Sequence, residues 1–217
     1  MSHAEPVSVD RYNTSHRADV RRISCATALL GEPLTRCFTD DETLADALTL
    51  YFTDYEPESC LVAIDETGVV GYVIGTRDAA AMRLVFGWRV FPRLAAKAVM
   101  RGDLLRRKDL KFIVHSVTGF LRGEFSTSRF SREYPATLHI NVDPDSRSRN
   151  VGSALLGHYM ELLRKQAVAG VHVSTMSDRA RSFFEKHGFQ VLAEGRRTFL
   201  RYCLGRDLPL FVLGRKL

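Results

Sequence analysis

The sequence predicts a mixed α/β protein in which helices flank a central mixed sheet. Leu138, Ile140 and Val142 alternate with polar residues, which is the period of a strand. Apolar residues then recur at a spacing of three to four from Leu155 to Leu163, which is the period of an amphipathic helix. Strand and helix patterns alternate along the rest of the chain, so we expect parallel pairing around this central helix.

Length and composition restrict the class of protein. The 217 residues, 45% of them hydrophobic, suit one domain spanning 1–217 with a proper core. We find neither a charge-free apolar run of about 18 residues nor a secretory signal, so we expect a cytoplasmic protein without a transmembrane segment. The net charge of +6 favours anionic ligands, but no nucleic-acid-binding motif is present, so no nucleic acid partner is expected.

The cysteines form no C-x-x-C pair, and in a cytosolic protein we expect all of them to be reduced thiols. They are Cys25, Cys37, Cys60 and Cys203.

The first part of the chain predicts two helices and a hairpin after a frayed terminus at residues 1–10. Asp19 is a plausible N-cap for a helix over 20–30, which Gly31 would end. Asp40 or Asp41 would cap a second helix. Residues 60–64 and 69–75 predict two strands joined by a tight turn at 65–68.

Residues 76–135 interrupt the strand pattern and predict a helical insert before the central strand. Arg89, Arg93, Lys97 and Arg101 fall four apart and therefore share one helical face, while Pro92 marks a helix start or a kink. This basic face could serve as a substrate lid or a membrane-surface face. The simpler interpretation is a solvated stripe on a helix that packs against the sheet.

The last part of the chain predicts a strand over 170–175, a helix over 178–187 ended by Gly188, and further strands over 189–193, 198–204 and 209–213.

The turn between the central strand and its helix has the chemistry of an anion site. Pro144 closes the strand, and Arg147, Arg149, Asn150 and Gly152 follow before the helix. Free backbone N–H groups and the positive end of the helix dipole favour a phosphate there, with two guanidinium groups beside it.

This stretch, V-D-P-D-S-R-S-R-N-V-G-S, resembles the acyl-CoA-binding motif Q/R-x-x-G-x-G/A of the GNAT superfamily of N-acyltransferases. Residues 177–189 resemble the later N-x-x-A-x-x-F-Y-x-x-x-G-F segment. Two registers fit the first motif, one over 147–152 and one over 149–154. We prefer the first, which keeps V-D-P in phase and places Asn150 at the first glycine, because Asn tolerates positive φ best after Gly.

The resemblance implies that acetyl-CoA, or another acyl-CoA, is the donor. It assigns the donor to Val142, Arg147, Ser148, Arg149, Asn150, Val151, Gly152, Ser153, Ser177 and Phe184. A backbone N–H near Val142 would hold the thioester carbonyl where the strand splays from its neighbour. Phe184 stands where the family often has a Tyr that protonates the CoA thiolate. Either Tyr134, Tyr159 or Tyr202 serves as the acid, or solvent does, or the thiolate leaves unaided.

The acceptor must become a neutral amine before it attacks, which requires a general base. On the polar face of the central strand we select His139 as the base, with Asn141 to orient the substrate or a water; Glu133 and Tyr134 are second choices. The predicted function is N-acetyl transfer to a primary amine of a small molecule or peptide, and a homodimer is one assembly left open. The alternatives are a non-catalytic acyl-CoA-binding regulatory module and a membrane-surface-associated acyltransferase that uses the basic insert.

Overall fold

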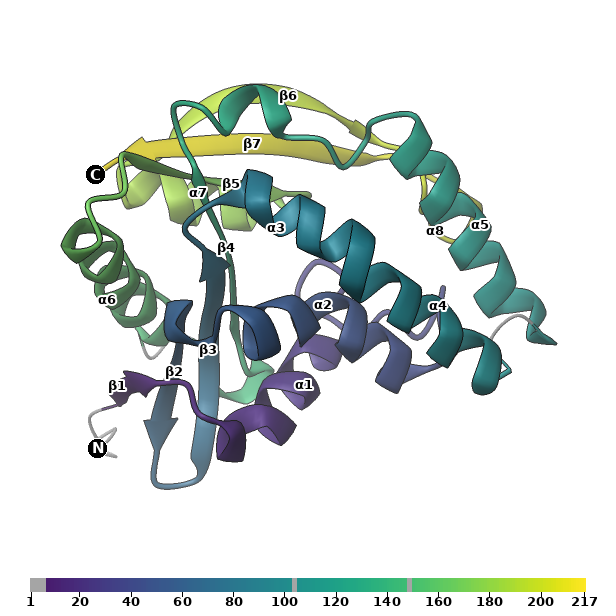
Figure 1. Ribbon diagram of the computed structural model, residues 1–217, viewed down its shortest axis with the longest axis horizontal. Helices are drawn as coiled ribbons and strands as arrows, with labels where there is room; N and C mark the ends of the chain where they lie inside the picture. Colours follow the sequence, from purple (N-terminus) through teal and green to yellow (C-terminus); the bar gives the residue numbers. More distant parts are fainter. Residues whose placement is uncertain (1–6, 103–104, 148–149) are drawn as a thin grey trace.

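The computed structural model describes residues 7–102, 105–147 and 150–217, and within these residues seven strands form one sheet in the order β1-β2-β3-β4-β5-β7-β6 (Figure 1). The strands are β1 (Ser8–Arg11), β2 (Cys60–Asp65), β3 (Gly68–Thr76), β4 (Ala136–Val142), β5 (Gly170–Thr175), β6 (Gln190–Arg197) and β7 (Leu208–Lys216). The helices are α1 (Arg17–Ala26), α2 (Asp41–Tyr55), α3 (Ala79–Val85), α4 (Phe91–Met100), α5 (Arg107–Leu121), α6 (Val151–Lys165), α7 (Asp178–Lys186) and α8 (Arg201–Leu204). Single turns are η1 (Thr14–His16), η2 (Pro57–Ser59), η5 (Ser128–Phe130) and η6 (Pro144–Ser146), and a π-helical turn, η3 (Phe86–Val90), joins α3 to α4. The predicted mixed α/β fold is confirmed.

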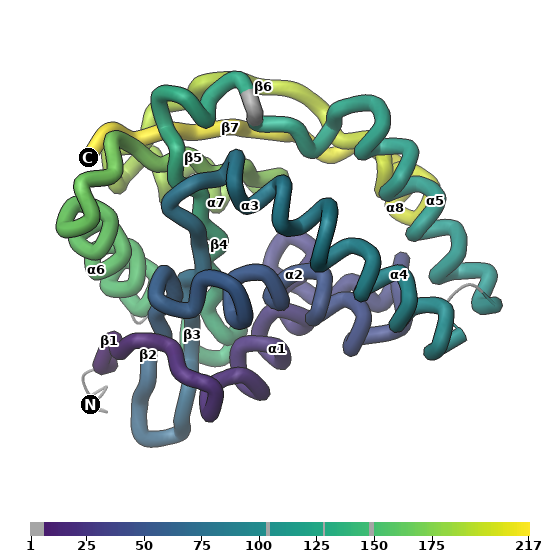
Figure 2. The backbone as a smooth tube through the Cα atoms, viewed as in Figure 1, coloured from purple at the N-terminus to yellow at the C-terminus, as the bar shows by residue number. Residues whose placement is uncertain are grey.

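Helices cover both faces of the sheet, as the tube in Figure 2 also shows. On one face, α6 and α7 pack against the sheet in a core that includes Leu155, Tyr159 and Phe184. On the other face, α1 and α2 form a second core with Tyr72 and Ile74 of β3. The polar side chains of β4 therefore point toward α1 and α2, as the strand alternation predicts.

The sheet divides between β4 and β5. These two strands pair in parallel, as expected, but only at Ala136–Val171 and Thr137–His172, whereas β3 and β4 stay paired from Thr76–Thr137 to Gly71–Val142. Figure 1 shows the result: β2, β3 and β4 run steeply, while β7 and its neighbours run across the view. From residue 138 onward β4 is bonded along one edge alone among the described strands, and the other edge is open.

The first helices were placed well, with differences at their ends. Asp40 caps α2 by accepting from the N–H groups of Glu42 and Thr43, as predicted. Asp19 is not the N-cap of α1, because the helix begins at Arg17 and places Asp19 in its first turn. Residues 8–10 were wrongly expected to fray: they belong to β1, which pairs with β2.

The predicted strand over 198–204 is wrong, because the chain turns into the short helix α8. The Glu124 carboxylate accepts hydrogen bonds from the backbone N–H groups of Thr198 and Phe199, at 2.8 and 3.3 Å. These donors are therefore unavailable to a strand partner, and β6 ends at Arg197. Gly205, at φ +71°, then ends α8.

The basic stripe of the insert is exposed at Arg89 and Arg93 and pairs with an acid of α2 at its other end, so the interpretation as a solvated stripe holds for part of it. Arg93 donates to the Tyr55 hydroxyl at 2.6 Å, and Lys97 lies 2.8 Å from the carboxylate of Asp46. Arg101 lies 3.9 Å from the same carboxylate, which is only 3% exposed. Pro92 stands in the first turn of α4, as predicted for a helix start, where its missing N–H removes no helical bond.

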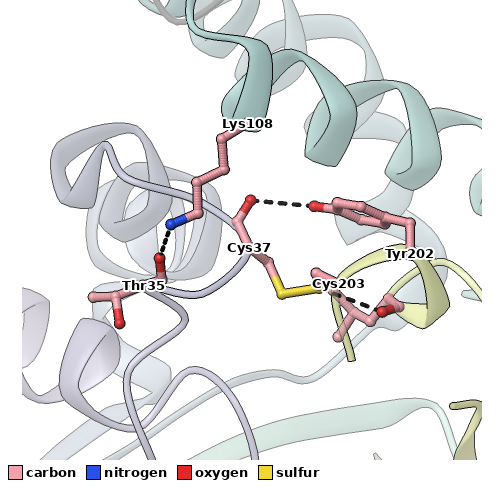
Figure 3. Close-up of a disulfide and its surroundings, with 6 residues drawn as sticks. Thr35, Cys37, Lys108, Tyr202 and Cys203 are labelled. Carbon is pink, nitrogen blue, oxygen red and sulfur yellow. Dashed lines mark hydrogen bonds between the residues drawn. A yellow bond between two sulfur atoms is a disulfide. The ribbon is translucent and has the colours of Figure 1, made fainter. Parts of the chain in front are cut away.

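The expectation of four reduced thiols is wrong for two of them. Cys37, in the connection between α1 and α2, forms a disulfide with Cys203 of α8, 166 residues later (Figure 3). The bond lies within a third apolar cluster, and Tyr202 donates to the Cys37 carbonyl at 3.1 Å. Cys25 and Cys60 are free. The sequence could not predict this disulfide, because the two cysteines are 166 residues apart in the chain and only the fold brings them together.

Candidate active site

The start of α6 provides the anion site that the turn predicts. Asn150 lies in the left-handed region, at φ +58°, directly before the helix, and contributes no side-chain cap. The first intrahelical bond in this helix joins the Ala154 N–H to the Asn150 carbonyl at 3.0 Å. The N–H groups of the first turn, from Val151 to Ser153, consequently lack an intrahelical acceptor and stand at the positive end of the helix dipole.

The left-handed residue also supports the preferred register of the motif. In that register Asn150 occupies the first glycine position, which is where the backbone here requires positive φ. Gly152 lies within the helix and does not need positive φ. A side chain there would be close to its neighbours, because a Cβ would be 3.5 Å from the Phe183 ring and 3.8 Å from Val142. A larger side chain at Gly152 would occupy the region in front of the first-turn N–H groups.

Of the two arginines predicted in the turn, the structure describes Arg147. Arg147 donates to the backbone carbonyl of Gly31 and so braces the turn against the connection that follows α1. Ser148 and Arg149 lie outside the described residues. A guanidinium already bonded to a carbonyl adds positive charge near a phosphate but offers fewer N–H groups to it.

The open edge of β4 provides backbone donors. The Asp143 N–H donates to the Val70 carbonyl of β3 at 2.9 Å. Because N–H groups alternate in direction along an antiparallel strand, residues 139 and 141 also face β3, whereas Leu138, Ile140 and Val142 direct theirs to the opposite edge. That edge is where β4 has left β5. The Val142 N–H is therefore on the open side, next to the start of α6.

His139 lies on the face of β4 that points toward α2. Its ring is 5.5 Å from that of Phe52 in an edge-to-face arrangement, and it stands opposite Ile74 of β3. Part of the side chain reaches solvent, yet desolvation by the surrounding protein lowers the pKa of His139 below its ordinary value. The imidazole is consequently neutral near pH 7 and can accept a proton.

The two polar residues that follow on the same face are both held by neighbours. Asn141 donates from Nδ2 to the buried Tyr72 hydroxyl at 2.7 Å. Asp143 pairs with Arg22 of α1 at 2.5 Å. Burial opposes ionisation of Asp143, but the hydrogen bonds from Arg22 and the Asp145 N–H outweigh it and lower the pKa. Asp143 is thus an ionised structural group, and Asn141 has a fixed orientation.

The remaining predicted residues occupy three different places. Tyr134 precedes β4 at the end where β4 and β5 still pair, and its ring packs on Gly170 and Gly214, where a Cβ would lie 3.0 Å away. Ser177 is the N-cap of α7, accepting from the Ala180 N–H at 3.3 Å. Phe184 is buried between the rings of Phe183 and Phe189. The structure therefore does not bring Tyr134 together with His139.

The other tyrosines proposed as an acid direct their hydroxyls at backbone carbonyls. Tyr159 donates to Thr137 at 3.4 Å on the β3 side of β4, over Gly75, where a Cβ would lie 2.0 Å from the phenol oxygen. Tyr202 donates to Cys37, and burial raises the pKa of this phenol to about 12. Neither hydroxyl faces the open edge of β4. Tyr72 and Arg22 were not predicted as site residues, although the alternation along β3 could have indicated that Tyr72 shares a face of the sheet with Asn141.

Comparison with known proteins identifies the fold. Residues 108–191 match the family model described as acetyltransferase (GNAT) domain. The crystal structure of SsHAT superposes with a TM-score of 0.76 at 26% identity, covering 98% of each chain. Polyamine N-acetyltransferase of Drosophila melanogaster, which catalyses the formation of N-acetylagmatine, gives a TM-score of 0.63 at 18% identity, covering 98% of this chain and 100% of its own. The yncA protein of Salmonella typhimurium, solved with its cofactor acetyl-CoA, gives 0.58 at 16%, covering 98% and 95%.

Proposed function

Because this chain is an acyltransferase of the GNAT superfamily, we propose that it transfers the acetyl group of acetyl-CoA to a primary amine of a small molecule or peptide. One observation carries the proposal: the open edge of β4 meets the first turn of α6, to which Asn150 contributes no side-chain cap, at residues 142–153. The two features together supply backbone donors for a thioester carbonyl and, beyond it, for a pyrophosphate. We also propose that residues 1–217 form one acyltransferase domain with its insert at 76–135.

The donor half of the site would work through the backbone. The Val142 N–H would donate a hydrogen bond to the thioester oxygen as negative charge develops there, and the N–H groups of residues 151–153 would bind the pyrophosphate. Asn150 sets the direction of these groups through its left-handed backbone. Arg147 holds the turn in place, and Ser177 caps the start of α7.

The acceptor half would use the face of β4 that points toward α2. The neutral His139 would take the proton that the ammonium group loses, either directly or through a water, and the free amine would then attack the thioester carbon. As the C–S bond breaks, the nitrogen would lose its second proton to solvent and become the amide nitrogen. Asn141 would orient the amine or that water, since its amide is held by Tyr72. Because Phe184 has no proton to give, the thiolate would leave without a phenol donor and take its proton from solvent.

The proposal is tested by CoA thiol release. The purified protein is incubated with acetyl-CoA and a panel of amines, including agmatine, a polyamine, an amino sugar and an N-terminal peptide, and free thiol is followed with a chromogenic disulfide. We expect amine-dependent release for at least one member and an acetylated product of the added mass. CoA binding in the absence of release for every amine would contradict the catalytic proposal.

That outcome would favour the second candidate, a non-catalytic acyl-CoA-binding regulatory module. The specific observation behind it is the buried Phe184 in the place of the usual phenol, with Tyr159 and Tyr202 both bonded elsewhere. Calorimetric titration with CoA separates this module from a chain that binds no CoA at all.

A further inference from the structure

The outer side of α5 carries a narrow apolar stripe that no described element covers. Leu110, Val114, Val117 and Leu121 follow one another at spacings of four, three and four, so they fall on one side of the helix. They are 40%, 51%, 42% and 77% exposed. The opposite side of α5 packs Phe112 and Ile113 into the third apolar cluster. Figure 1 shows α5 at the outer edge of the molecule.

Positive charge runs along one flank of this stripe. At about 100° per residue, Arg107, Lys111 and Arg122 project on the same side of the stripe. None of the three forms an ion pair with a described residue. The acidic residue of α5, Asp109, is fully buried and bonded to the N–H and hydroxyl of Thr39, at 2.8 and 2.6 Å. Between 105 and 123 the described outer surface is therefore apolar and cationic.

We propose that α5 docks this protein on an anionic lipid bilayer, with the four apolar side chains in the interface and the three cations on lipid phosphates. An interfacial helix has this arrangement of an apolar stripe beside basic residues. The basic stripe of α4 is not part of this surface, because its residues pair with α2. No described helix is long and apolar enough to cross a bilayer. The inference is independent of the proposed catalytic function.

The charge of this surface favours an anionic bilayer over two other partners, a second copy of the chain and a nucleic acid. A second copy of the chain would bring Arg107, Lys111 and Arg122 against the same cations, with no exposed acid on α5 to neutralise them. A nucleic acid would pair with the cations but would leave the apolar stripe in water. An anionic bilayer satisfies both parts of the surface at once.

The test is sedimentation with sucrose-loaded vesicles of phosphatidylcholine containing phosphatidylserine, compared with phosphatidylcholine alone. We expect partitioning that requires the anionic lipid and weakens with salt. Val114→Gln/Val117→Gln should weaken it at least about tenfold, since polar side chains then face the interface. Lys111→Glu/Arg122→Glu should weaken it by at least about 25-fold, on the basis of about fivefold for each cation removed.

The matched control is Leu84→Gln/Val99→Gln, which changes two residues that are 65% and 60% exposed on α3 and α4. It should bind vesicles as the unchanged protein does, and thermal unfolding should show that every variant is folded. Absence of serine-lipid-dependent partitioning would overturn the proposal, as would equal losses for the α5 variant and the control. Full displacement of the protein from vesicles by an equimolar DNA duplex would assign the surface to nucleic acid instead.

Discussion

Asn141 of β4 and Tyr72 of β3 stand directly opposite each other and share a 2.7 Å hydrogen bond from the amide nitrogen to the phenol oxygen. Tyr72 is almost completely buried, and desolvation raises the pKa of its phenol. This bond fixes one of the two polar groups that border the proposed acceptor side. It also fixes the local pairing of β3 with β4, the strand whose other edge is open.

Tyr72→Phe should destabilise the protein by about 1–2 kcal/mol, because the partly buried Asn141 amide loses its acceptor. It should also raise the KM for the amine more than it lowers kcat, since Asn141 would no longer be oriented. Tyr12→Phe is the control: the Tyr12 hydroxyl is buried without a hydrogen-bond partner among the described residues. Its loss should change the free energy of unfolding in urea by less than about 0.5 kcal/mol. Equal effects of the two changes would remove the role assigned to Asn141.

His139→Ala should lower kcat by about 10²- to 10⁴-fold, the range for loss of a general base. Because desolvation lowers the pKa of His139, the wild-type rate should fall on the acidic side of neutrality, as the imidazole gains its proton, and this limb should vanish in the variant. His158→Ala is the control, since His158 is exposed and bonds only the Ala154 carbonyl of its own helix among the described residues. An unchanged pH–rate profile in His139→Ala would make His139 a structural residue.

Gly152→Asp should weaken CoA binding by about hundredfold or more, equivalent to roughly 2.7 kcal/mol, because a carboxylate would face the pyrophosphate. Gly157→Asp places the same side chain on the same helix, where a Cβ meets no atom within 4 Å. This control should bind CoA as the wild type does. Calorimetric titration measures both, and equal affinities for the two variants would contradict the assignment of residues 150–153 to the donor.

Asp46→Asn should lower the free energy of unfolding by about 2–3 kcal/mol, because Arg21 and Lys97 would lose the buried charge that they share. Asp54→Asn, which breaks an exposed pair with Arg17, should lower it by about 1 kcal/mol or less. Burial opposes ionisation of Asp46, but its bonds with Lys97 and Arg21 prevail and lower the pKa from 3.8. The contribution of Asp46 should therefore be complete above pH 4 and be lost as the pH falls further. Urea unfolding at pH 7 and pH 3 checks both points.

The sequence was informative wherever local chemistry decides the structure. Asn150 could be placed in a left-handed turn because few other residues tolerate that conformation, and the helix after it follows from apolar spacing. The alternation around His139 and Asn141 likewise put both residues on the same face of β4. In these cases, residues close in the sequence determine the backbone conformation and the direction of the side chains.

Predictions failed where distant residues decide. The strand expected over 198–204 is prevented by Glu124, which lies 74 residues earlier. The end of the basic stripe at Lys97 and Arg101 looked solvated because Asp46, its partner, lies on another helix. Tyr134 was expected near the acceptor because it precedes β4. Its ring instead packs on Gly170 of β5 and Gly214 of β7, at the end of β4 away from the open edge. Periodicity contains no information on such partners.

The disulfide between Cys37 and Cys203 has a mechanical consequence. A force applied to the two ends of the chain, as by an unfoldase that feeds a protease, would first unravel the elements outside the two cysteines, which include β1, α1 and β7, and would then pass through the sulfur–sulfur bond. Most of the molecule between them, including β4, α6 and the residues around His139, would carry no tension while the bond is intact. Threading from either end would have to draw two strands of chain together through a pore. A reductant would therefore set how quickly such a machine could take the protein apart.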